Sequence, residues 1–161
     1  MKHRRIVAAS LTLVLALFSL SFKDCKNKNT NGGQQQTNAV REAAIAADDI
    51  AAAVKAMTDA KEDLLKNGKI TKAESHTLTQ LLLKVEEADR AFISSIRQVQ
   101  QFNASNKPNF LNLFTTISSA VDQLNTSGVL GIQNADAKSR LSTIITTFNA
   151  AVAIIRARLG Q

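Results

Sequence analysis

The sequence predicts an all-α protein: an antiparallel up-down-up-down four-helix bundle preceded by a signal segment and a disordered tether. Three observations predict it. From residue 39 onward, apolar residues recur at steps of three and four, which is the spacing of amphipathic helices. No segment alternates at a period of two, as a half-buried strand would. The breaks between the periodic stretches are short, and short connections make consecutive long helices antiparallel.

The first 21 residues have the pattern of a secretory signal peptide. A basic start is followed by an uncharged apolar run over residues 6–20. Ser19 and Ser21 provide the small-x-small pattern that suits cleavage after Ser21. We therefore expect export to the periplasm or envelope. The alternative is an uncleaved membrane anchor, because the apolar stretch extended through Phe22 reaches the lower length limit of a spanning helix.

Cys25 is the only cysteine of the chain, and its place just after the apolar run suggests lipid attachment as a further alternative. The residues before it, Lys23 and Asp24, are charged where a lipoprotein signal has small apolar side chains. This departure argues against acylation of Cys25. A single cysteine also excludes an intramolecular disulfide. In each of these cases, only the N-terminal segment contacts a membrane.

Residues 22–38 predict a flexible polar tether. From residue 23 onward this stretch holds no aliphatic residue and is rich in Asn, Gln, Gly and Lys. It can bury too little apolar surface to order itself. The bundle is therefore expected over residues 39–161.

The first two helices are predicted over residues 39–67 and 71–104. The first carries an apolar stripe from Val40 to Leu64 and ends at Asn67-Gly68, residues that tolerate the left-handed conformation at a helix C-terminus. The second begins at Thr71, which forms a capping box with Glu74. Its stripe runs from Leu78 to Phe102.

The other two helices are predicted over residues 108–127 and 134–159. Pro108 suits the first turn of the third helix, and Asn134 suits the N-cap of the fourth. The third helix is too short to cover the second at 1.5 Å per residue. Either the tip around Asn67-Gly68 projects past the bundle, or the apolar loop that follows the third helix folds under it as a lid, which is the alternative we favour. The aliphatic residues of this lid are Val129, Leu130 and Ile132.

The turn over residues 63–74, DLLKNGKITKAE, is the motif closest to a known site, because it resembles a degenerate calcium-binding EF-hand loop. The oxygen donors of such a site are Asp63, Asn67, Thr71 and Glu74. Leu65 stands at a position that needs an oxygen ligand, and Lys69 adds a positive charge. A capped helix–turn–helix explains the same residues and is the interpretation we favour. A calcium- or metal-responsive binding module is the alternative function.

Other chemistry is sparse, so we expect no enzyme and no cofactor. His76 falls on the outer face of its helix, and Met57 on the core face. Neither a hydrolase motif nor a phosphate-binding loop occurs. The chain has no Trp or Tyr and no dense basic stripe, and its formal net charge of +7 falls to +4 once the three basic residues of the signal are removed. A nucleic-acid partner is therefore not expected.

One surface stands out by its lack of charge. The fifteen residues between Arg140 and Arg156 are uncharged, and the predicted third helix carries only Asp122. Such small polar faces suit association, since few long side chains must be ordered. We therefore expect a protein partner or self-association through the third and fourth helices. The predicted function is an exported, non-enzymatic helical bundle of the bacterial cell envelope with a binding or structural role.

Overall fold

The computed structural model describes residues 36–161, and these residues form helices joined by short connections. The helices are α1 (Asn38–Lys66), α2 (Lys72–Ile96), α3 (Lys107–Gln123), the short π-helix η1 (Leu124–Val129) and α4 (Ala135–Leu159). No strand occurs between residues 36 and 161, which confirms the predicted all-α class. The predicted signal segment over residues 1–21, Cys25 and most of the predicted tether lie outside the described residues.

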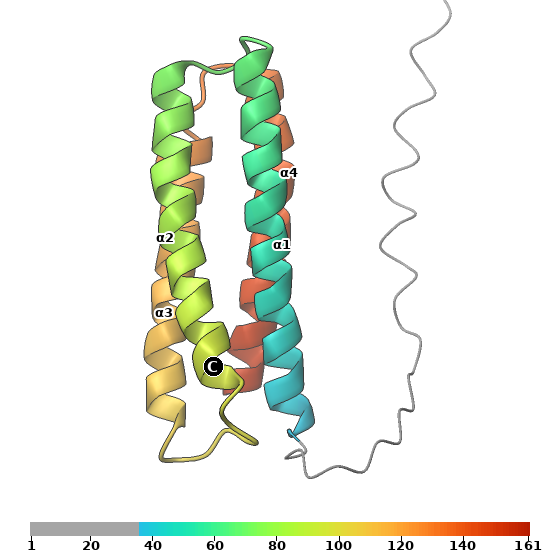
Figure 1. Ribbon diagram of the computed structural model, residues 1–161, viewed down its shortest axis with the longest axis vertical. Helices are drawn as coiled ribbons and strands as arrows, with labels where there is room; N and C mark the ends of the chain where they lie inside the picture. The colour runs from blue at the N-terminus through green and yellow to red at the C-terminus, as the bar shows by residue number, and fades with distance from the viewer. Residues whose placement is uncertain (1–35) are drawn as a thin grey trace, which may run out of the picture. The chain divides into compact units, whose positions relative to one another are not determined.

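The four α-helices lie side by side (Figure 1). Helix α1 packs against α2 and α4, and α3 packs against the same two helices, so the four form a closed ring around one core. The α1–α2 and α3–α4 connections lie at one end of the helices, and the α2–α3 connection lies at the other (Figure 1). Between residues 36 and 161, no helix has the length and apolar character needed to cross a membrane.

The core runs the whole length of the helices and is mainly aliphatic. Met57, Phe92, Phe110 and Phe148 are almost completely buried. The rings of Phe92 and Phe110 meet edge to face, with their centroids 5.8 Å apart. Half of the side chains that α1 buries are alanines, and small side chains let neighbouring helices approach closely.

The helix ends follow the predicted local chemistry at several points. Gly68, just after α1, has a φ of +65°, the left-handed conformation that favours glycine. Pro108 lies in the first turn of α3. The side chain of Asn134 accepts a hydrogen bond from the backbone N–H of Ala137 at 2.9 Å, as an N-cap residue should.

Helix α2 ends at Ile96, well before residue 104, so the predicted end was wrong. The apolar stripe does continue, because Phe102 packs edge to face on Phe110 with centroids 5.1 Å apart. The backbone, however, turns at Asn103. The side-chain oxygen of Asn103 accepts hydrogen bonds from the N–H groups of Ser105 and Asn106, at 2.9 and 3.0 Å. Such local side-chain bonds compete with the helix.

The predicted tether ends earlier than residue 38. Helix α1 begins at Asn38, and the two residues before it are bonded to the end of α2. The amide of Gln36 donates to the carbonyl oxygens of Ile96 and Val99 at 3.2 and 3.0 Å. The N–H of Thr37 donates to the carbonyl oxygen of Gln100 at 2.7 Å. These bonds hold the start of α1 against the last residue of α2 and the connection that follows it.

Helix α3 passes into η1 instead of ending near residue 127. Gly128 is buried within η1, where a Cβ atom would lie 3.1 Å from side-chain carbons of both Leu78 and Leu81. The lack of a side chain at Gly128 therefore lets η1 approach α2 closely. The predicted lid forms in part: Val129 and Ile132 are buried, whereas Leu130 is 52% exposed. Leu130 lies in the turn after η1, and the prediction of its burial was wrong.

Candidate functional site

The four residues of the predicted EF-hand-like turn lie at the junction between α1 and α2. Asp63 belongs to the last turn of α1, and Asn67 is the residue after that helix. Thr71 is the N-cap of α2, and Glu74 lies in its first turn. The first part of the turn is therefore helical, whereas an EF-hand loop supplies its ligands from a coiled segment.

The Asp63 carboxylate is directed at protein donors. Its Oδ2 atom accepts a hydrogen bond from the Arg140 guanidinium of α4, and its Oδ1 atom accepts one from the Asn67 amide at 3.0 Å. The hydrogen bond from Arg140 is the main reason why the pKa of Asp63 lies below its usual value. This contact joins α1 to α4.

The Glu74 carboxylate uses both of its oxygens within the protein. Oε2 accepts from the N–H of Thr71 at 2.7 Å, and the N–H of Glu74 donates to Thr71 Oγ1 at 3.1 Å, which completes the predicted capping box. Oε1 accepts from the N–H of Gln133 at 2.9 Å. The bonds from Thr71 and then Gln133 lower the pKa of Glu74.

These contacts make the turn a link between two connections of the bundle. We call it the end clasp and define it by six residues: Asp63, Asn67, Thr71, Glu74, Gln133 and Arg140. In residues 36–161, no group of three His, Cys, Asp or Glu side chains is placed to hold a metal ion. The arrangement stabilises the end of the bundle where the α1–α2 and α3–α4 connections meet.

We expect Glu74→Gln to lower the free energy of unfolding by about 1 kcal/mol at pH 7, because the charge-assisted bonds to Thr71 and Gln133 are weakened. The pKa of Glu74 is lowered in the folded protein, so this contribution is present above the unfolded pKa and is lost as the pH falls through the folded one. Urea unfolding between pH 3 and pH 7 measures it.

Glu62→Gln is the matched control, since Glu62 is an exposed carboxylate at the same end of α1. It should change the free energy of unfolding by less than about 0.5 kcal/mol. A calcium module behaves differently: millimolar calcium raises the melting temperature of the wild type, and Glu74→Gln removes that rise. If this pattern is observed, the turn is a calcium site and the interpretation of the end clasp as a purely structural feature is wrong.

The other residues singled out in the sequence lie where helical spacing placed them. His76 is exposed on α2, and Met57 is fully buried on α1. Lys61, which interrupts the apolar stripe of α1, is nearly buried. Its Nζ atom donates to Thr79 Oγ1 at 2.8 Å and so joins α1 to α2.

Asp89 is a buried acid that the sequence analysis missed. It is 2% exposed, and its Oδ1 atom has no hydrogen-bond partner among the described residues. Burial, followed by the nearby charge of Asp48, raises the pKa of Asp89 to about 7. The sequence does contain an indication that Asp89 is buried: it lies four residues after Val85 and three before Phe92, within the apolar stripe of α2.

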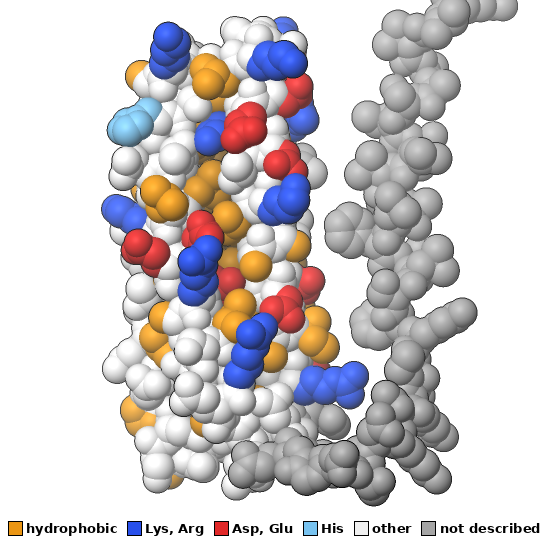
Figure 2. All heavy atoms as spheres, in the orientation of Figure 1, with side chains coloured by type: hydrophobic (Ala, Val, Ile, Leu, Met, Phe, Trp, Pro, Cys, Tyr) orange, Lys and Arg blue, Asp and Glu red, His pale blue; other side chains and the backbone are white. Residues whose placement is uncertain are grey.

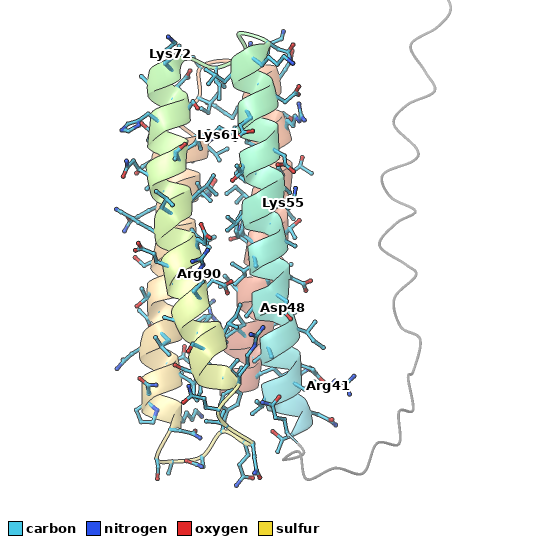
Figure 3. All side chains as sticks on the ribbon, in the orientation of Figure 1. Arg41, Asp48, Lys55, Lys61, Lys72 and Arg90 are labelled. Carbon is cyan, nitrogen blue, oxygen red and sulfur yellow. The ribbon has the colours of Figure 1, made fainter. Side chains whose placement is uncertain are left out.

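Asp89 lines a groove between α1 and α2 of about 410 Å³. We call it the Asp89 groove, and its lining residues are Ala51, Val54, Lys55, Thr58, Glu86, Asp89, Arg90 and Ile93. Figure 2 shows hydrophobic side chains along the seam between these two helices, with basic and acidic side chains on both sides. Lys55 on α1 and Arg90 on α2 lie on this face of the bundle (Figure 3).

Comparison with family models, with curated proteins and with solved structures gives no match for this chain. The described residues therefore define its class by architecture alone, as an all-helical bundle.

Proposed function

We propose that this protein is an exported, non-enzymatic four-helix bundle of the bacterial cell envelope, with up-down-up-down topology and a binding or structural role. The connections between consecutive helices support the topology, because they lie at alternating ends (Figure 1). The basic start and apolar run of residues 1–20 support export, because they have the pattern of a secretory signal peptide.

The observation that carries a binding role is the uncharged outer surface of α3 and α4. We call it the α3–α4 surface and define it by exposed residues: Asn112, Thr115, Thr116, Ser119, Thr143, Thr146, Thr147 and Asn149. On α1 and α2, by contrast, the exposed positions include many charged side chains, among them the ion pairs Lys55–Asp59 and Arg90–Glu86.

The threonines of this surface are less polar than their residue type suggests. The hydroxyl groups of Thr115, Thr116 and Thr146 each donate to a backbone carbonyl one turn earlier in the same helix. A partner that covers them therefore leaves no hydroxyl hydrogen without an acceptor. Short side chains also lose little rotamer freedom on binding. Both effects lower the cost of docking a protein or a second copy of this chain.

Site-specific photo-crosslinking in the intact cell tests the binding role. A photo-reactive amino acid is placed at Thr116 or Thr146 of the full chain, and at the exposed Gln80 of α2 as control. We expect a discrete crosslinked species from the first two positions and none from Gln80. A product of twice the chain mass identifies self-association, and any other mass identifies a partner. Equal crosslinking at all three positions, or at none, would contradict a docking role for the α3–α4 surface.

Intact-mass analysis of the protein from its native host tests export separately. Cleavage after Ser21 gives a chain that starts at Phe22, which is the expected result. A chain that starts at an acylated Cys25, or one that retains the whole apolar run, identifies the lipid-anchored or membrane-anchored alternative. A full-length chain recovered from the cytoplasm would contradict the envelope role.

A further inference from the structure

The carboxylate of Asp89 is a buried negative group without a counter-charge of its own. Only 2% of the residue is exposed, and Oδ1 lacks a hydrogen-bond donor. A buried polar atom that stays unpaired costs about 1–3 kcal/mol, and more when the group is charged. A carboxylate in this position is therefore strongly favoured to bind a donor that enters from the groove it lines.

The basic side chains that line the Asp89 groove are already engaged. Lys55 Nζ lies 2.7 Å from Asp59, and the guanidinium of Arg90 is paired with Glu86. Asp48 of α1 adds a further negative charge, which acts on Asp89. The groove is lined by two acids, Glu86 and Asp89, and by two bases, Lys55 and Arg90. Since both bases are paired elsewhere, Asp89 is the charged side chain of the groove that has no ion-pair partner among the described residues.

The groove also has an aliphatic part beside its charged side chains. Val54, Ala51 and Ile93 contribute aliphatic side chains from the two helices, and the volume of about 410 Å³ holds a small organic molecule and not a protein segment. The chemistry that fits is a positive head that donates hydrogen bonds, attached to a short hydrocarbon chain. A hydrated divalent cation would leave the aliphatic part of the groove unused.

We propose that the Asp89 groove binds a small primary alkylammonium ion, with the ammonium group on the Asp89 carboxylate and the alkyl chain between Val54 and Ile93. This site goes beyond the proposed envelope role and does not depend on it, since the groove lies between α1 and α2. Binding forms no covalent bond: it consists of charge-assisted hydrogen bonds to Asp89 and apolar contact of the alkyl chain.

Binding must depend on pH, because only the ionised carboxylate attracts the cation. The groups that face Asp89 are Asp48 and Lys55 from α1, and Glu86 and Arg90 from its own helix. With a pKa of about 7 for Asp89, affinity rises as the pH rises through neutrality. We expect binding at pH 8.5 to be about 30-fold tighter than at pH 5.5, where the carboxyl group is mostly protonated.

The test uses n-butylammonium chloride as the probe and sodium chloride at the same ionic strength as its control. The carboxyl ¹³C resonance of Asp89 is followed by NMR in the full chain during titration at both pH values. We expect a saturable shift with butylammonium, and a lower apparent pKa for Asp89 when the probe is bound. Asp89→Asn should weaken binding at least about tenfold, since it removes the charge and keeps the shape.

Two further variants separate the site from general charge effects. Glu87→Gln removes an exposed carboxylate two residues away on the same helix and should leave the affinity unchanged. Ala51→Phe fills the groove from α1 without touching the carboxylate and should abolish the saturable shift. No saturable shift of Asp89 in the wild type at pH 8.5, or equal binding by Asp89→Asn, would overturn the proposal.

Discussion

Phe92→Ala is expected to lower the free energy of unfolding by about 3–5 kcal/mol, which is the usual cost of removing a fully buried aromatic ring. Phe92 is 0% exposed, and its ring meets that of Phe110 edge to face. Phe110 in turn meets Phe102, in the connection between α2 and α3. Loss of the Phe92 ring leaves a cavity where α2, α3 and this connection are held together.

Urea unfolding at pH 7 measures the change, and Leu83→Ala is the surface control. Leu83 lies on the same helix but is 48% exposed, so its truncation should cost less than about 0.5 kcal/mol. Phe92→Leu keeps part of the volume and should fall between the two. If Phe92→Ala and Leu83→Ala cost the same, the aromatic contacts would not form the centre of this end of the core.

The fold class could be predicted because the information is local. The apolar stripe of each helix and the caps at Thr71 and Asn134 lie within a few residues along the chain. A capping box needs only a hydroxyl and a carboxylate three residues apart, and the structure contains that pair. Helical periodicity likewise places Met57 in the core and His76 outside it.

The end of α2 at Ile96 could not be predicted from the apolar stripe, and part of the bonding at that end comes from far away in the sequence. The carbonyl oxygens of Ile96 and Val99 are capped by Gln36, which is 60 and 63 residues distant. An apolar stripe that continued to Phe102 gave no reason to end the helix at Ile96. The ordering of Gln36 and Thr37, which composition assigned to the tether, follows from the same contacts.

In the candidate site, too, the local contacts could be predicted and the distant ones could not. The bond between Thr71 and Glu74 is local and was predicted, whereas Gln133 and Arg140 reach the clasp from 59 and 77 residues away. Asp89 was overlooked for a different reason. An acid is ordinarily exposed on a helix, and only the packing of α1 against this edge of α2 buries Asp89.

The stability of the protein is expected to fall as the pH rises from about 4 to about 7.5, through the titration of Asp89. Its folded pKa of about 7 is above the unfolded value near 4, so the folded state binds the proton more tightly. The stabilisation is complete below the unfolded pKa and is lost as the pH rises through the folded one. Because the groove opens to solvent, the carboxylate is only partly desolvated. We therefore expect the free energy of unfolding to fall by about 2–4 kcal/mol.

Comparison of the wild type with Asp89→Asn isolates this contribution from those of Asp63 and Glu74, whose lowered pKa values act in the opposite direction. The variant should be more stable than the wild type by about 2–4 kcal/mol at pH 8.5, and the difference should vanish near pH 4. Asp48→Asn should remove part of the wild-type loss, since the charge of Asp48 is the second cause of the raised pKa. If the free energy of unfolding varies with pH in the same way for the wild type and Asp89→Asn, the prediction is contradicted. Asp89 would then be ionised at neutral pH without loss of stability, and a group already in the protein would have to supply its counter-charge.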